Sequence, residues 1–226
     1  VYGPMMAGWS SGNNFALLGG QRAAALMISA EIAIGASIMG IVMIYGSLNM
    51  MDIVRGQGEL LWGWLPKWGI VTQPLAFILF VTAGIATTKR IPFDLPESES
   101  EIIGYNVEYS GMKFGMFLMT DMVETTVIAG MCTSLFLGGW QVPFLFSDGF
   151  HVPGGALLAV SSLVVTLMQV GSFVTKVAVM IFILMLIRWT LPRFRYDQAM
   201  RLGWLGLFPL SVLNIVLTGA VLLAWG

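Results

Sequence analysis

Four charged side chains lie inside segments that are otherwise apolar: Glu31, Asp121, Glu124 and Lys176. A charge inside a membrane-spanning helix costs about 2.5–3.5 kcal/mol on insertion scales, so such residues usually serve an ion pathway, a site or an interhelical pair. Asp121 and Glu124 stand at i, i+3 spacing, which puts both carboxylates on one helix face. Because two such charges repel, at least one tends to hold a proton, which favours a proton relay. The structural alternative is that each carboxylate pairs with Lys176 or with an arginine of a partner chain.

An acidic loop follows the second apolar segment, directly after two basic residues. It reads Lys89-Arg90-Ile91-Pro92-Phe93-Asp94-Leu95-Pro96-Glu97-Ser98-Glu99-Ser100-Glu101 and continues through Glu108. Proline restricts the residue before it to extended backbone, so Pro92 and Pro96 predict a shaped loop before the next helix. Apolar residues such as Phe93 indicate burial against the membrane or a partner. The alternative is a solvated acidic loop that docks a basic partner.

A second loop, residues 191–198, combines basic and aromatic side chains. It contains Arg193, Phe194, Arg195, Tyr196 and Asp197. An arginine can hold a carboxylate bidentately while the rings pack at the membrane interface. Anchoring to lipid headgroups explains the same pattern equally well, so both interpretations stay open.

The sequence predicts no metal site. Cys132 is the single cysteine, and one thiol forms neither an internal disulfide nor a cysteine-rich metal site. Because it lies in an apolar run, we interpret it as a small buried hydrophobic residue. His151 is the single histidine and lies among Gly and Pro, so we interpret it as a loop residue.

Membrane helices must position these residues. Of the 226 residues, 57% are hydrophobic and 10% charged, with a mean hydropathy of +0.84, whereas an average soluble domain has roughly 25% charged residues. The apolar runs that can cross about 30 Å of hydrocarbon are residues 23–48, 68–88, 114–138, 156–187 and 202–225. The fourth run is either one tilted helix or carries a separate interfacial helix before Gly171. The predicted fold is an all-α membrane bundle.

The distribution of Lys and Arg predicts the orientation of this bundle. Most of them flank the loops at residues 91–112 and 191–201, which places these loops in the cytoplasm. Residues 1–22 are expected to be the end of a preceding helix and a cytoplasmic loop, and residues 23–226 a single membrane domain with an acidic cytoplasmic loop at 89–113. The first residues lack the features of a signal peptide, so we expect the chain to begin within a longer protein. The net charge of −1 argues against nucleic-acid binding.

Several motifs, in order along the chain, resemble one family. They are Gly8-Trp9-Ser10-Ser11, Arg22-Ala23-Ala24-Ala25 leading to Ser29-Ala30-Glu31, Arg90-Ile91-Pro92-Phe93-Asp94-Leu95-Pro96-Glu97, Asn106-Val107-Glu108-Tyr109-Ser110-Gly111-Met112-Lys113-Phe114 and Leu191-Pro192-Arg193-Phe194-Arg195-Tyr196-Asp197-Gln198. The family is the H-type membrane subunit of bacterial NADH:quinone oxidoreductase, respiratory complex I, whose mitochondrial counterpart is NADH dehydrogenase subunit 1. That family has about eight spans, so the chain resembles its C-terminal five.

The resemblance implies a subunit that binds no redox centre itself. It implies a wall of the tunnel through which quinone, the substrate, reaches an iron-sulfur cluster, with the clusters and FMN held by partner subunits. The implied partners are the peripheral-arm subunits of the quinone site, neighbouring small membrane subunits and lipid. The implied location is the bacterial inner membrane, with the mitochondrial inner membrane as the alternative.

The resemblance also implies residue roles. It assigns to the proton path Glu31, Asp121, Glu124 and Lys176. It assigns to the quinone chamber and its coupling loop Arg22, Phe93, Asp94, Glu97, Glu99, Glu101 and Glu108. It assigns to interfaces with partner chains Arg193, Arg195 and Asp197.

The sequence departs from the family at several positions of the proton path. Where the family often reads Ala-Glu-Thr-Asn-Arg, this chain reads Ala86-Thr87-Thr88-Lys89-Arg90, so Thr87 replaces a carboxylate. Asn is usual at the position of Glu124, and we hypothesise that Glu124 supplies the carboxylate that Thr87 lacks.

Two other functions fit the same helices. A homologous membrane component of a membrane-bound hydrogenase, or of a ferredoxin-linked or coenzyme F420-linked complex, would keep the fold and change the electron donor. A standalone ion transporter is the alternative from another class, and the absence of internal repeats argues against it.

Overall fold

The computed structural model describes residues 1–61, 65–95, 104–146, 149–151, 157–158 and 161–225. Glu97, Glu99 and Glu101 lie outside the described residues. The fold is an all-α membrane bundle, as predicted. Within the described residues, the helical stretches long and apolar enough to cross a membrane are Asn14–Tyr45, Met112–Phe136, Ser162–Thr190 and Tyr196–Ala224, and Pro74–Thr87 is a shorter apolar helix.

Helix α2 (Asn14–Tyr45) lies at the centre of one layer. Its N-cap Asn13 accepts a hydrogen bond from the Phe15 backbone N–H at 3.0 Å, and Gly46 ends it with a left-handed φ of 63° that glycine adopts without strain. α2 packs against α1 (Tyr2–Ser10), α5 (Pro74–Thr87) and α9 (Phe208–Trp225). Small buried residues, among them Ala23, Ala33 and Gly40, let these helices approach closely.

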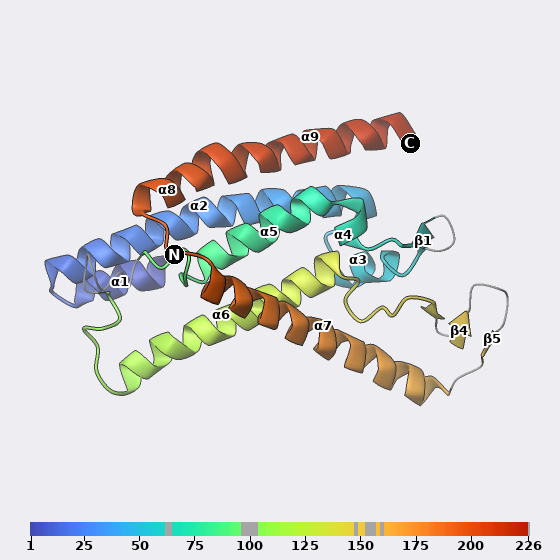
Figure 1. Ribbon diagram of the computed structural model, residues 1–226, viewed down its shortest axis with the longest axis horizontal. Coiled ribbons are helices and arrows are strands. Elements are labelled where there is room, and N and C mark those ends of the chain that lie inside the picture. The colour runs from blue at the N-terminus through green and yellow to red at the C-terminus, as the bar shows by residue number, and fades with distance from the viewer. Residues whose placement is uncertain (62–64, 96–103, 147–148, 152–156, 159–160, 226) are drawn as a thin grey trace.

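Helices α6 (Met112–Phe136) and α7 (Ser162–Thr190) cross each other beside this layer (Figure 1). Phe136 near the end of α6 packs its ring 5.4 Å from that of Phe80 on α5 and 5.6 Å from that of Phe77. α7 is one continuous helix, which decides between the two predictions for the fourth run. It begins at Ser162 rather than at residue 156 because Ser161 has extended backbone, with φ −57° and ψ 139°.

The second predicted span is broken. The short helix α4 (Gly69–Thr72) is separated from α5 by Gln73, whose φ of −140° and ψ of 63° are not helical. Pro74 has no backbone N–H, so it cannot continue the α4 hydrogen bonds, but it suits the first turn of a new helix. The Gln73 carboxamide is buried at the break, where its oxygen accepts from Asn214 Nδ2 at 2.7 Å and its nitrogen donates to Thr218 Oγ1 at 2.5 Å.

The C-terminal span is also irregular. α8 (Tyr196–Arg201) leads through a π turn, η1 (Leu202–Leu207), into α9. Pro209 follows the π turn, and a proline inside a helix clashes with the carbonyl four residues earlier, here Leu205. A Cβ at Gly203 would overlap Ser29 Oγ, so this glycine permits the contact between η1 and α2.

Short helices and strands that the sequence did not predict lie at the end of the bundle where α2 and α6 terminate (Figure 1). They are α3 (Met50–Gly56), the antiparallel pair β1 (Leu60–Leu61) and β2 (Leu65–Pro66), and the three-stranded sheet of β3 (Leu145–Phe146), β4 (Gly149–His151) and β5 (Leu157–Leu158). His151 pairs with Leu157 in this sheet, so it lies in a short strand rather than in a loop. Cys132 is buried with a free thiol, as predicted.

Candidate functional site

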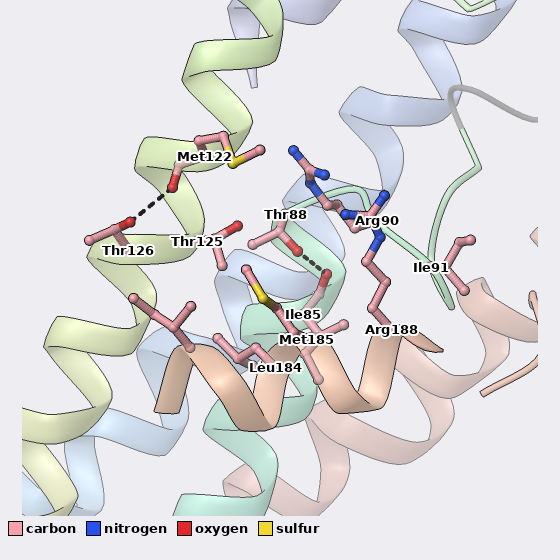
Figure 2. A pocket seen from close by; sticks show the side chains of 11 residues that line it. Ile85, Thr88, Arg90, Ile91, Met122, Thr125, Thr126, Leu184, Met185 and Arg188 are labelled. Carbon is pink, nitrogen blue, oxygen red and sulfur yellow. Dashed lines mark hydrogen bonds between the residues drawn. The ribbon is translucent and has the colours of Figure 1, made fainter. Parts of the chain in front are cut away.

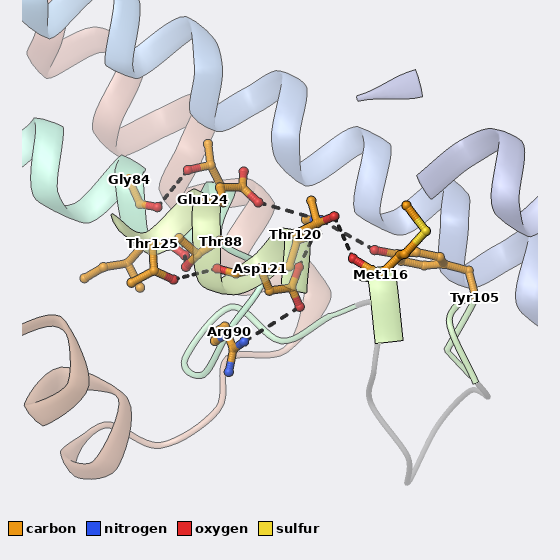
Figure 3. Close-up of polar contacts among 12 residues, drawn as sticks. Gly84, Thr88, Arg90, Tyr105, Met116, Thr120, Asp121, Glu124 and Thr125 are labelled. Carbon is orange, nitrogen blue, oxygen red and sulfur yellow. Dashed lines mark hydrogen bonds and ion pairs between the residues drawn. The ribbon is translucent and has the colours of Figure 1, made fainter. Parts of the chain in front are cut away.

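A charged cluster, buried at its lysine and half-buried at its other members, joins the end of α5 to the N-terminal half of α6. We define the cluster as Lys89, Arg90, Asp121 and Glu124. Lys89 Nζ lies 3.7 Å from Asp121 Oδ1 and 3.9 Å from Glu124 Oε2. Arg90 Nη2 lies 4.0 Å from Asp121 Oδ2 (Figure 3). Both carboxylates share one face of α6, as their spacing predicts. They pair with Lys89 and Arg90, so the alternative that they pair with Lys176 is wrong.

The local sequence explains why Lys89 stands there. The hydroxyls of Thr87 and Thr88 donate to the carbonyls of Gly84 and Ile85 at 2.7 and 2.8 Å, which closes the last turn of α5. Lys89 then takes a left-handed φ of 53°, and the chain turns away from the helix axis. A cation beyond the last turn of a helix also interacts favourably with the helix dipole.

The charge state of Lys89 follows from its neighbours. Burial alone lowers the pKa of Lys89, because the ammonium loses water. Its interactions with Tyr105, Glu124 and Asp121 outweigh burial, so the pKa is raised above its ordinary value of 10.5. Lys89 is therefore protonated at neutral pH.

An apolar cavity of about 160 Å³ opens beside the cluster, between α5, α6 and α7 (Figure 2). Its apolar walls include Ile85, Met122 and Leu184, and it also contains threonine hydroxyls. Arg90 and Arg188 line it as well. Within the described part of the chain, Arg188 has no carboxylate within 4 Å, and the buried Nε of Arg90 has no hydrogen-bond partner.

A second cavity of about 150 Å³ adjoins the first and shares Arg90, Ile91 and Arg188 with it. The remaining walls carry more charge and are formed by Lys89, Asp94, Leu118 and Asp121. The apolar space therefore leads directly to charged groups on α6 and on the segment after α5.

The two loops singled out in the sequence pack against each other. Arg193 Nη2 donates to Asp94 Oδ2 at 2.5 Å, the Phe194 N–H donates to the Pro92 carbonyl at 2.9 Å, and the rings of Phe93 and Phe194 lie 5.3 Å apart. Arg193 thus binds a carboxylate, one of its two predicted uses. These contacts hold the start of the acidic loop, residues 92–94, against the second loop.

Other predicted site residues lie around this region. The Arg22 guanidinium lies 5.6 Å from the centre of the Tyr196 ring, and Glu108 accepts from Asn13 Nδ2 at 2.6 Å. Arg195 and Asp197 are exposed at the start of α8. Glu31 is exposed on α2 and close enough to Glu124 to act on it electrostatically.

Lys176 lies at the opposite end of α6, apart from the carboxylates. Its ammonium donates to the carbonyls of Leu137, Gly139 and Gln141 at 2.8, 3.1 and 2.7 Å and lies 4.5 Å from the centre of the Trp68 ring. These contacts satisfy carbonyls that follow the C-terminal end of α6.

Sequence reasoning missed the site residues Lys89, Arg90 and Arg188. Their positions directly after one apolar segment and at the end of another resemble ordinary flanking charges, and only the fold turns them toward a cavity. Among the described residues, no group of three or more His, Cys, Asp or Glu side chains could hold a metal ion.

Comparisons with known proteins agree on one family. The family model described as NADH dehydrogenase matches residues 1–219. The chain is 41% identical over 224 residues to an H-type subunit of the NADH-quinone oxidoreductase of Cytophaga hutchinsonii, with 99% of this chain and 61% of that protein covered. It is 41% identical over 227 residues to the corresponding H-type subunit of Paramagnetospirillum magneticum, with 100% and 60% covered.

A third relative is the NADH-quinone oxidoreductase subunit 8 of Rhodothermus marinus, 41% identical over 221 residues, with 96% of this chain and 62% of the relative covered. The chain spans about three-fifths of the length of these curated relatives. With a family model that matches almost the whole chain and such similarity to these relatives, the chain belongs to the NADH dehydrogenase family.

Proposed function

We propose that this chain is part of the membrane subunit of a proton-pumping NADH:quinone oxidoreductase in the bacterial inner membrane. In this proposal it forms part of the wall of the quinone path and the start of the proton path. The observation that carries the proposal is the apolar cavity that leads to the charged cluster on α6. The names of the relatives favour quinone chemistry over that of a hydrogenase.

The cavity suits a quinone, which combines an apolar tail with a ring that carries two oxygens. Ile85, Met122 and Leu184 supply apolar contacts, and the guanidinium groups of Arg90 and Arg188 supply hydrogen-bond donors for oxygen or developing negative charge. Each cavity is smaller than the roughly 300–1,000 Å³ of a typical ligand site. We therefore assign to this chain one wall of the site, with other walls from the rest of the subunit and from peripheral-arm partners.

Quinone reduction can drive proton movement through the cluster. A quinone takes up two electrons and two protons to form a quinol, and the electrons come from NADH through the FMN and iron-sulfur clusters of partner subunits. Negative charge in a poorly hydrated cavity acts strongly on nearby carboxylates. Asp121 borders the charged cavity and Glu124 lies on the same helix face, with Glu31 in electrostatic range. These three carboxylates form the proposed start of the proton path.

The acidic loop has a place in this proposal. We assign Glu97, Glu99 and Glu101 to the quinone chamber, as the family resemblance implies. The contacts of Asp94 with Arg193 and of Phe93 with Phe194 would hold the described start of the loop. The exposed side chains of Arg195 and Asp197 are available for contacts with partner chains. The assignment of Lys176 to the proton path is a prediction that its carbonyl contacts do not support.

The proposal is tested by filling the cavity in the assembled complex. Thr126 lines the cavity, so Thr126→Phe is expected to raise the KM for quinone about tenfold by removing binding space. Val127→Phe is the matched control, because Val127 is exposed on the same helix and does not line the cavity. NADH oxidation by a water-soluble acceptor should stay unchanged in both variants. An unchanged KM in Thr126→Phe would contradict the quinone path proposed here.

A further inference from the structure

Lys89 has a backbone conformation that lysine rarely adopts. Among the described residues other than glycine, Lys89 and Phe144 have positive φ, and the φ of Lys89 is 53°. This left-handed region crowds the Cβ of most residues, and asparagine tolerates it better than lysine does. The side chain is also buried, with 8% exposed. Since the backbone conformation does not favour lysine here, any advantage of this residue comes from the charge of its side chain.

The Lys89 ammonium lies among acceptors from two other segments. It lies 3.5 Å from the Tyr105 hydroxyl, 3.7 Å from Asp121 Oδ1 and 3.9 Å from Glu124 Oε2. All three distances are long for a contact of an ammonium group with oxygen. Lys89 also borders the charged cavity, whose other charged walls are Arg90, Asp94, Asp121 and Arg188.

Glu124 depends on this ammonium. Its Oε2 atom is buried and makes no hydrogen bond, and among the described side chains Lys89 is the cation within 4 Å of it. Asp121 has Arg90 as a second cation, but at 4.0 Å. A buried carboxylate without a counter-charge is strongly unfavourable. Removal of Lys89 would therefore affect Glu124 most.

We infer that Lys89 is a positioning residue, the counter-ion that holds Asp121 and Glu124 in their charged state beside the cavity. Because none of its contacts with the described residues is tight, the ammonium can turn toward negative charge that enters the cavity. The carboxylates are then less compensated and more ready to take up protons. The inference rests on the proposed function, because it assigns to the cavity a substrate that becomes negatively charged.

A double-variant cycle in the assembled complex tests the inference. Lys89→Asn keeps a residue that tolerates the left-handed backbone and removes the charge. Glu124→Gln removes the carboxylate that depends on Lys89. The double variant removes both charges, so neither is left without its partner. The control is Lys113→Asn, which removes an exposed lysine from the first turn of α6. The readouts are the amount of assembled complex, the rate of quinone reduction with a protonophore present, and the KM for quinone.

Lys89→Asn is expected to slow quinone reduction about tenfold with little change in KM. Added to Glu124→Gln, the same substitution is expected to cause less than a threefold further loss, because the carboxylate that depends on Lys89 is already gone. Lys89→Arg, which keeps the charge, should stay within about threefold of wild type. Where Lys89→Asn lowers assembly, the double variant should recover the amount of complex, because no unpaired charge is left. A full tenfold loss when Lys89→Asn is added to Glu124→Gln, or a Lys89→Asn variant equal to Lys113→Asn, overturns the inference.

Failure of the proposed function has a different signature. An unchanged quinone KM in Thr126→Phe contradicts the proposed quinone path. Recovery of assembly in the double variant still measures the pairing of Lys89 with Glu124. The two conclusions can therefore fail separately.

Discussion

The two ends of α6 both hold polar groups at the edge of an apolar bundle, and they hold them differently. At the C-terminal end, the Gln57 side chain is fully buried, donates to the carbonyls of Ser134 and Leu135 at 3.0 Å each, and accepts from the N–H groups of Gly138 at 2.8 Å and Gly69 at 3.3 Å. Lys176 satisfies three further carbonyls there.

At the N-terminal end, the charged cluster is held loosely. Its ion pairs are 3.7–4.0 Å long, and Arg90 Nε and Glu124 Oε2 are buried without a hydrogen bond. Buried polar groups in a purely structural role are normally satisfied, and exceptions need an explanation. The contrast indicates that the C-terminal end fixes the fold. In the proposed function, the N-terminal end gives up stability for a site that can change its charge.

Lys176→Met should produce the largest effect on stability, because it disrupts the polar contacts at the C-terminal end of α6. The substitution keeps an unbranched side chain that is one atom shorter, and it leaves three carbonyls without their donor, at a cost of about 3 kcal/mol. We expect a lower thermal midpoint of the complex, and quinone reduction per assembled complex close to wild type. If assembled complex retained full stability but lost proton pumping, Lys176 would belong to the proton path after all.

Asp121→Asn should act in the opposite way, on activity more than on stability. It removes a carboxylate that faces the charged cavity but keeps the size of the side chain. We expect coupled turnover to fall about tenfold, which corresponds to about 1.4 kcal/mol. The protons pumped per quinone reduced should be measured in reconstituted vesicles, with Glu124→Gln as a parallel variant. Turnover and pumping equal to wild type in both variants would remove these carboxylates from the proton path.

Arg193→Ala, at the junction between the two loops, should have the smallest effect. The Arg193 side chain is 37% exposed, so its pair with Asp94 is partly screened and contributes about 1 kcal/mol or less. We expect the thermal midpoint of the complex to fall only slightly. The rate at which a protease cleaves the acidic loop is a second measurement of the same contact. If Arg193→Ala lowered the thermal midpoint as much as Lys176→Met does, the stability of the whole complex would depend on this loop junction, contrary to the expectation.

Much of the fold follows from local properties of the sequence. The predicted run at 114–138 became α6 and the run at 202–225 became η1 and α9 because hydropathy over about 20 residues is a local signal. The break at Gln73 was not predicted. Pro74 marks a possible break, but the buried carboxamide at the break is satisfied by Asn214 and Thr218 from a helix far along the chain.

Composition, motifs and residue spacing are enough to establish that the chain is an all-α membrane protein, that its motifs resemble one family, and that Asp121 and Glu124 share a helix face. Which cation faces these carboxylates depends on the fold. Lys176 looked like the natural partner because it lies inside a span, whereas Lys89 looked like an ordinary flanking charge. The physical reason is that ion pairing depends on how helices cross: α7 carries Lys176 to the far end of α6, and the left-handed turn after α5 brings Lys89 to the carboxylates.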